Sequence, residues 1–187
     1  MRIEQLYFEL VPTAFGPLAI IWWQAEAGPR VRQLFLSKPH MSAEHAVREG
    51  YPQVQRLSCP VTAELGDRLS RFLVGQAITF PLDSIALELC GQFQRRVLLA
   101  EYAIPRGCVS TYGRIARHVG APGASRAVGR ALATNPFPIV IPCHRAVRSD
   151  GDLGGYQGGT AMKRALLAME GVEFNAQDKV RMDWVTY

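Results

Sequence analysis

A cysteine followed directly by two basic residues stands out in the stretch "IPCHRAV", where Cys143 precedes His144 and Arg145. A cysteine is a strong nucleophile only as the thiolate, and a basic neighbour or a hydrogen-bonded relay lowers its pKa. Because adjacent side chains do not normally face each other, a bridging water is the expected link between Cys143 and His144. The motif predicts a nucleophilic cysteine; the alternative is the buried, reduced thiol that is ordinary for cysteine.

A histidine that acts as a base needs an acceptor to orient its ring. Glu170 is the candidate, because it stands at the end of an expected helix, where a carboxylate opposes the helix dipole and requires a local partner. The alternative from the residues alone is that Glu170 is a solvated surface acid.

Positive charge is concentrated in the second half of the chain. The protein has 187 residues and a formal net charge of +5. Residues 92–187 hold 13 Lys and Arg against 7 Asp and Glu, and within 92–148 nine arginines face the single acid Glu101. A localised arginine-rich field is typical of a protein that binds a polyanion. A merely solvated basic face is the alternative.

The first half is expected to be α/β. Residues 6–11 and 18–25 are rich in β-branched and aromatic residues and predict a hairpin, with a third strand over 31–37. Helical spacing and end signals predict helices over 41–51, with Ser42 as N-cap, and over 61–75.

The second half is expected to be mainly helical. An amphipathic helix is predicted over 92–103. Two short helices, from Ser110 or Thr111 to Val119 and from 124 to 133, flank the turn "GAPG" and form a helix-turn-helix candidate. The second helix is slim, so it suits a close approach to a nucleic-acid backbone better than base reading in the major groove. Close packing of helix on helix is the alternative.

A short buried strand is expected over 139–141, ending at Pro142, and a close-fitting glycine loop over 151–159. Thr160 is expected to cap a last helix that closes on Gly171. The change in composition near residues 84–91 predicts an N-terminal domain over 1–84, a linker over 85–91 and a C-terminal domain over 92–187.

No run approaches the roughly 18 apolar residues of a membrane span, and the first residues lack the pattern of a signal peptide. A cytoplasmic protein is therefore expected. The remaining cysteines, Cys59, Cys90 and Cys108, form no CxxC pair and have no histidine at zinc-finger spacing. Reduced thiols without a zinc site are the prediction.

Four stretches, "ASRAVGRALATNPFPIVIPCHR", "IPCHRAV", "GGYQGG" and "LLAMEG", together resemble the O6-alkylguanine-DNA alkyltransferase family. The resemblance covers roughly residues 92–174. It implies a ribonuclease-H-like α/β N-terminal domain and a mainly α C-terminal domain with a helix-turn-helix. The reaction it implies is stoichiometric transfer of the alkyl group from O6-alkylguanine, and from O4-alkylthymine, in double-stranded DNA to Cys143. No cofactor takes part, and the protein is expected to be a monomer that binds DNA, with cooperativity left open.

The resemblance also implies roles for individual residues. Cys143 is the acceptor, His144 the base acting through water, and Glu170 its orienting partner. Asn135 braces the segment between recognition helix and active site, and Tyr112 donates a hydrogen bond to the guanine ring. Arg126 fills the gap left by the flipped base. The other DNA contacts implied are Thr111, Ser125, Ala127 and Gly129, and the substrate pocket is implied to involve Tyr156, Ala146, Gln157 and Gly158.

Two of these positions depart from the family pattern. Ala146 stands where the family often has valine, and Gln157 where it commonly has Ser or Arg, which leaves the accepted size of the O6 substituent open. Two other functions remain possible from the residues. One is a non-catalytic helix-turn-helix protein that recognises alkylated DNA; the other is a Cys/His hydrolase, which the sequence disfavours because its Cys and His normally come from separate segments.

Overall fold

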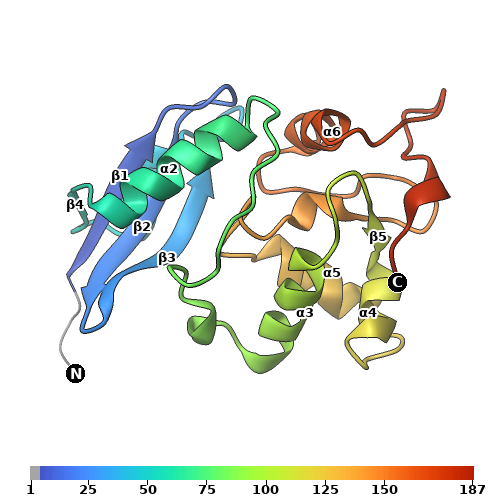
Figure 1. Ribbon diagram of the computed structural model, residues 1–187, viewed down its shortest axis with the longest axis horizontal. Helices are drawn as coiled ribbons and strands as arrows, with labels where there is room; N and C mark the ends of the chain where they lie inside the picture. The colour runs from blue at the N-terminus through green and yellow to red at the C-terminus, as the bar shows by residue number, and fades with distance from the viewer. Residues whose placement is uncertain (1–4) are drawn as a thin grey trace. The chain divides into compact units, whose positions relative to one another are not determined.

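The computed structural model describes residues 5–187, and the chain divides into two compact units. One runs to Leu89 and also contains Pro136–Pro138; the other comprises Cys90–Asn135 and Ile139–Tyr187. Figure 1 shows the helices and strands of each unit. No helix among residues 5–187 is long and apolar enough to cross a bilayer.

The first unit is built on a mixed four-stranded sheet. Its strands are β1 (Leu6–Val11), β2 (Leu18–Ala25), β3 (Gly28–Leu36) and β4 (Gln55–Arg56), in the order β3-β2-β1-β4. The first three pair antiparallel, which confirms the predicted hairpin and third strand, and β4 pairs parallel to β1.

The two faces of this sheet pack on different helices. Phe8, Ala19 and Ile21 share one face and form a buried cluster with α1 (Ala43–Gly50), whose N-cap Ser42 confirms the prediction. On the opposite face, α2 (Pro60–Phe72) contacts β1 and β2 (Figure 1). Successive side chains of β2 point to opposite faces of the sheet. Both sets are buried because one face packs on α1 and the other on α2.

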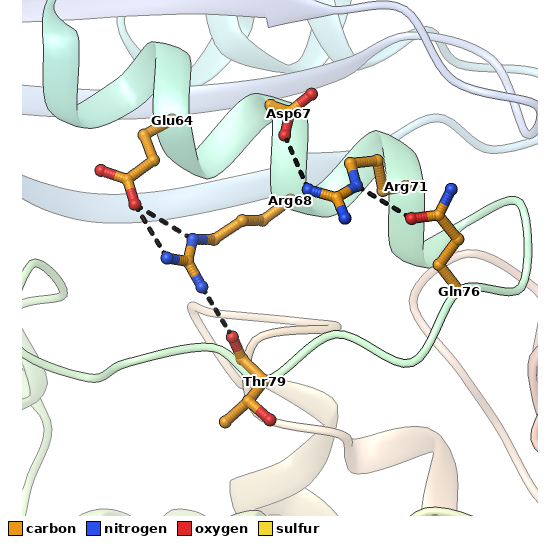
Figure 2. A network of polar contacts seen from close by, with 6 residues as sticks. All are labelled: Glu64, Asp67, Arg68, Arg71, Gln76 and Thr79. Atoms are coloured by element: carbon orange, nitrogen blue, oxygen red, sulfur yellow. Dashed lines mark hydrogen bonds and ion pairs between the residues drawn. The ribbon is translucent and has the colours of Figure 1, made fainter.

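Polar contacts along the exposed side of α2 attach the chain that follows it (Figure 2). Arg68 bonds Glu64 within the helix and donates to the carbonyl of Thr79 at 3.0 Å, and Arg71 bonds Gln76 at 2.9 Å. The Arg68–Glu64 pair is an i,i+4 pair within the helix and contributes only about 0.3–0.5 kcal/mol, whereas the bonds to Thr79 and Gln76 hold the segment that follows α2.

Residues 85–91 differ from the expected linker. Ile85 and Leu87 are buried, and η1 (Leu87–Leu89) is a 3-10 helix. The amide of Ala86 donates to the carbonyl of Val31 at 2.9 Å. The backbone of Val31 thus attaches the start of the segment to β3, and residues up to Leu89 belong to the first unit.

The second unit contains four α-helices, two 3-10 helices and a short two-stranded sheet. The α-helices are α3 (Gln92–Tyr102), α4 (Tyr112–His118), α5 (Ser125–Ala133) and α6 (Thr160–Met169), and the strands are β5 (Ser110–Thr111) and β6 (Ala146–Val147). α3, α4 and α5 pack on one another. Thr111 caps α4 as predicted, accepting from the amide of Arg114 at 3.2 Å.

Two local predictions in this unit are wrong. Residues 139–141 form no strand, because Ile139 has a φ of +75° and the chain turns there. The last helix is capped by Gly159, with Thr160 as its first residue and no side-chain capping bond. It does end as expected, with Glu170 as C-cap and Gly171 at positive φ.

Candidate active site

Cys143 lies in a buried turn that Asn135 holds from the end of α5. The side-chain amide of Asn135 donates to the carbonyl of Ile141 at 3.0 Å and to the sulfur of Cys143 at 3.2 Å. The amide of Cys143 donates to the carbonyl of Ile141 at 2.8 Å around Pro142, whose φ of −79° and ψ of 58° are those of an inverse γ-turn. Cys143 itself begins the 3-10 helix η2 (Cys143–Arg145).

The chain just before this turn is strained. Ile139 is β-branched and lies at a φ of +75°, a region that such side chains rarely adopt because the Cβ clashes with the backbone. Strain of this kind costs on the order of 1–3 kcal/mol and is held by its surroundings. Here the side chain of Ile139 is buried, so packing supplies the compensation.

The carboxylate of Glu170 binds both basic residues of the cysteine motif. Nε2 of His144 lies 3.0 Å from one carboxylate oxygen, and Arg145 binds both oxygens, at 2.7 and 2.8 Å. Both carboxylate partners are nearly sealed from solvent. Glu170 is therefore a buried member of a three-residue cluster, and the solvated surface acid is excluded.

The charge states in this cluster follow from burial and pairing. Burial would raise the pKa of Glu170, but the hydrogen bonds and charges of His144 and Arg145 outweigh it and lower the pKa to about 2. Burial lowers the pKa of His144, against the opposing pull of Glu170. A neutral imidazole beside an ionised carboxylate donates through Nε2, and its Nδ1 then carries the lone pair of a base.

The thiol itself differs from the expectation of an acidic cysteine. Burial raises the pKa of Cys143 to about 12, and the hydrogen bond from Asn135 is the strongest opposing influence. Loss of solvation affects the pKa of Cys143 more than the basic neighbours do, because the guanidinium of Arg145 pairs with Glu170 and not with the sulfur. The thiolate of this protein must therefore form with the help of a base rather than stand ready in the resting state.

Two tyrosines expected at the site lie close to this cysteine. The ring of Tyr156 contacts His144 edge to face, with centroids 6.2 Å apart, and its hydroxyl is buried without a hydrogen bond to any described residue. Burial raises the pKa of Tyr112 to about 12, and the charge of Cys143 contributes to the rise. Gly154, at a φ of +66°, leaves room for Tyr112, because a Cβ there would lie 3.0 Å from its hydroxyl.

The other expected pocket residues are placed around the same turn. Gln157 donates to the carbonyls of Asn135 at 2.8 Å and Ala133 at 3.2 Å, so it ties the glycine loop to the end of α5. Ala146 and Gly158 are buried. A Cβ on Gly158 would overlap the sulfur of Met162, so this glycine serves packing against α6.

The predicted DNA contacts lie on α4 and α5. Thr111, Tyr112 and Ser125 line a cleft of about 690 Å³ whose wall also includes Arg114, Arg117 and Arg148. Arg126 is exposed on the first turn of α5, while Ala127 and Gly129 are half-buried. A Cβ at Gly129 would meet nothing within 4 Å, so packing inside this chain does not explain that glycine.

Sequence reasoning missed the roles of three charged residues near the cysteine. Arg145 was expected only to act on the thiol, yet it braces Glu170 and donates to the carbonyl of Ile104 at 2.5 Å. Glu101 and Lys163 are fully buried, although their residue types usually lie at the surface. Their positions among the buried residues of α3 and α6 were the only signal in the sequence. Among the described residues, no three His, Cys, Asp or Glu side chains group to hold a metal ion.

The site combines a buried cysteine held by an amide, a neutral histidine on a carboxylate and an arginine-lined cleft. These features are those of a class of proteins that use a cysteine to act on a polyanion. Comparisons with known proteins narrow the class. Residues 92–172 match the model of the 6-O-methylguanine DNA methyltransferase DNA-binding domain. A methylated-DNA–protein-cysteine methyltransferase of Methanothermobacter thermautotrophicus is 44% identical over 131 residues, covering 69% of this chain and 73% of that protein.

A protein of the same name from Salmonella typhimurium is 36% identical and covers 89% of this chain and 96% of its own length. Among solved structures, the O6-methylguanine methyltransferase of Mycobacterium tuberculosis superposes with a TM-score of 0.71 at 30% identity, over 88% of this chain and 92% of that one. The chain belongs to the methylated-DNA–protein-cysteine methyltransferase family.

Proposed function

We propose that this protein repairs DNA by moving the alkyl group of O6-alkylguanine onto the sulfur of Cys143. The sulfur attacks the alkyl carbon in line, a carbon–sulfur bond forms and the bond from carbon to O6 breaks. The electron pair of that bond stays on the guanine, which recovers a proton and its normal structure. The thioether is stable, so each molecule acts once. The family membership supports this reaction, and O4-alkylthymine is a second substrate of the same chemistry.

The buried cluster supplies the proton transfer. His144 in its neutral form accepts the thiol proton through a water, and the ionised Glu170 stabilises the imidazolium that results. Asn135 donates to the sulfur and favours the anion. Because burial raises the pKa of Cys143 to about 12, removal of the thiol proton by His144 and attack on the alkyl carbon must be coupled. The thiol therefore reacts only when a substrate is in place.

The guanine must leave the helix stack before O6 can reach Cys143, because the atom lies inside the duplex. Arg126 is exposed at the start of α5 and can fill the space vacated by the base. Tyr112 then donates its hydrogen bond to the guanine ring as negative charge develops there. Its pKa of about 12 keeps the hydroxyl protonated for this task.

Double-stranded DNA is the proposed partner. One solved structure similar in fold is the Mycobacterium tuberculosis OGT in complex with DNA, with a TM-score of 0.68 at 31% identity. In this chain the arginine-lined cleft on α4 and the slim face of α5 suit phosphates and sugars, and such binding tolerates any sequence. Thr111 and Ser125 line the same cleft, and binding as a monomer is proposed.

The finer fold classes form part of the same proposal. A ribonuclease-H-like first unit is supported by the strand order β3-β2-β1-β4 with β4 parallel to β1. A helix-turn-helix is supported by α4 and α5, which pack on each other across the turn near Gly120 and Gly123.

The observation that carries the proposal is the hydrogen bond from Asn135 to the sulfur of Cys143, together with the adjacent His144–Glu170 pair. The test is incubation with duplex DNA containing O6-methylguanine, followed by mass spectrometry of the peptide that holds Cys143. A gain of one methylene in the wild type, absent in Cys143→Ser, is expected. DNA binding without any mass gain would refute transfer and favour a non-catalytic binder.

A further inference from the structure

A buried carboxyl group in α3 has no role in the mechanism so far. Glu101 is fully buried, and neither of its side-chain oxygens has a hydrogen-bond partner among the described residues. An ionised carboxylate is very costly in such a place, whereas the protonated acid costs much less. The surroundings therefore favour a neutral Glu101.

A buried ammonium group lies near it. Lys163 in α6 is fully buried, and its Nζ donates to the carbonyls of Ala146 and Leu153, each at 2.6 Å. These two oxygens replace part of the water that an ammonium loses on burial, so the charged form of Lys163 is partly solvated by the protein itself. Both carbonyls follow the active-site turn in the chain.

Burial raises the pKa of Glu101 to about 8, and the charges of Lys163 and Arg145 oppose the rise. Burial also lowers the pKa of Lys163 to about 8, with Cys143 and Glu101 opposing the fall. Five charged or titratable side chains are coupled to Glu101: Lys163, Arg145, Tyr112, Cys143 and Tyr187.

Because Glu101 and Lys163 interact, the proton lost near pH 8 belongs to the pair and not to either residue alone. Below that pH the pair holds one net positive charge. As the pH rises past 8 the pair loses this positive charge, whichever of the two groups gives up its proton first.

The two groups act on the reacting sulfur in opposite senses. A negative Glu101 raises the pKa of Cys143, and a positive Lys163 lowers it. We propose that Glu101 is a positioning residue for the transfer reaction: as the neutral acid, it leaves the buried Lys163 ammonium uncompensated, and this charge stabilises the Cys143 thiolate. The inference rests on the proposed function of Cys143 and adds a positive charge that acts on the sulfur, separate from the proton transfer to His144.

Infrared spectroscopy of the wild type tests the charge state without reference to activity. A carboxylic acid that keeps its proton at pH 7 is unusual for glutamate and gives a carbonyl band distinct from that of carboxylates. The band is expected at pH 7, to shift with 13C-labelled glutamate, to fade as the pH rises through about 8 and to be missing in Glu101→Gln. Absence of any such band between pH 6 and 7 overturns the proposal.

Single-turnover methyl transfer between pH 6 and 10 tests the effect on the reaction. In the wild type the rate is expected to rise with pH and to break near pH 8, where the pair loses its charge. Glu101→Gln should move that break by about one pH unit or more. Lys163→Met should slow transfer about tenfold at pH 7, equivalent to one unit in the thiol pKa.

Glu173→Gln provides the matched control, because Glu173 is an exposed acid that pairs with Arg181 at 2.8 Å. Its pH profile should coincide with that of the wild type. A profile of Glu101→Gln that also coincides with the wild type would contradict the positioning role. Wild-type protein that shows the acid band yet transfers no methyl group would instead refute the proposed function.

Discussion

Substitution of Glu170 by glutamine should destabilise the protein by an amount that depends on pH. The carboxylate is fully engaged by His144 and Arg145 and only 1% of its side chain is exposed. Its pKa falls from an ordinary value of 4.5 to about 2 in the folded protein. A depressed pKa of this size corresponds to about 3 kcal/mol of stability at neutral pH, at 1.36 kcal/mol per unit.

The sign of the pH dependence follows from the lowered pKa. The contribution is fully present above the unfolded pKa near 4.5 and is lost as the pH falls towards 2. The free energy of unfolding of Glu170→Gln should therefore lie about 3 kcal/mol below that of the wild type at pH 7, and only about 1–2 kcal/mol below it at pH 3.

Urea unfolding followed by circular dichroism at a series of pH values measures this difference. Glu173→Gln serves as the control, because exposed pairs contribute about 0–1 kcal/mol and Glu173 is two-thirds exposed. A deficit in Glu170→Gln that stays constant from pH 7 to pH 3 would show that lost packing, and not the charge of Glu170, causes it. A variant as stable as the wild type would refute the cluster's structural role altogether.

Three further substitutions test the DNA face and the pocket. Gly129→Ala should raise stability by about 1 kcal/mol because alanine favours the helix and its Cβ meets nothing, yet weaken duplex binding in a titration; unchanged binding would remove Gly129 from the interface. Gly154→Ala should cost about 1–2 kcal/mol in thermal unfolding because of its positive φ and slow transfer by displacing Tyr112; a normal transfer rate would contradict that contact. Arg126→Ala should slow repair of duplex DNA more than reaction with free O6-benzylguanine, and equal losses would rule out its part in base flipping.

The sequence predicted the elements that carry strong local signals. Ser42 and Thr111 cap their helices because their side chains satisfy free amides at the first turn. The β-branched and aromatic residues of β1 and β2 identified the hairpin. The residues alone left Glu170 open between an orienting partner of His144 and a surface acid, and the family resemblance favoured the pairing that the structure has.

Features set by tertiary packing could not be predicted in the same way. The apolar run at 139–141 favoured a strand, but Asn135 and Pro142 bend that segment into a turn. The acidity expected of Cys143 neglected desolvation, which depends on how completely the fold covers the sulfur. Lys163 lies on the buried side of α6, although charged residues usually mark the exposed side of a helix. Two backbone carbonyls that accept from its ammonium make this burial possible, and their positions depend on the tertiary fold.

The short segment Pro136–Pro138 has a consequence for how this protein can be divided. It is counted with the first unit, where Phe137 is buried and the carbonyl of Pro136 accepts from the amide of Leu34 at 2.7 Å. A single cut near residue 90 thus separates the buried Phe137 from the unit to which its segment belongs and leaves it on the other fragment. A fragment or fusion that keeps the first unit complete has to retain Pro136–Pro138 together with the residues up to Leu89.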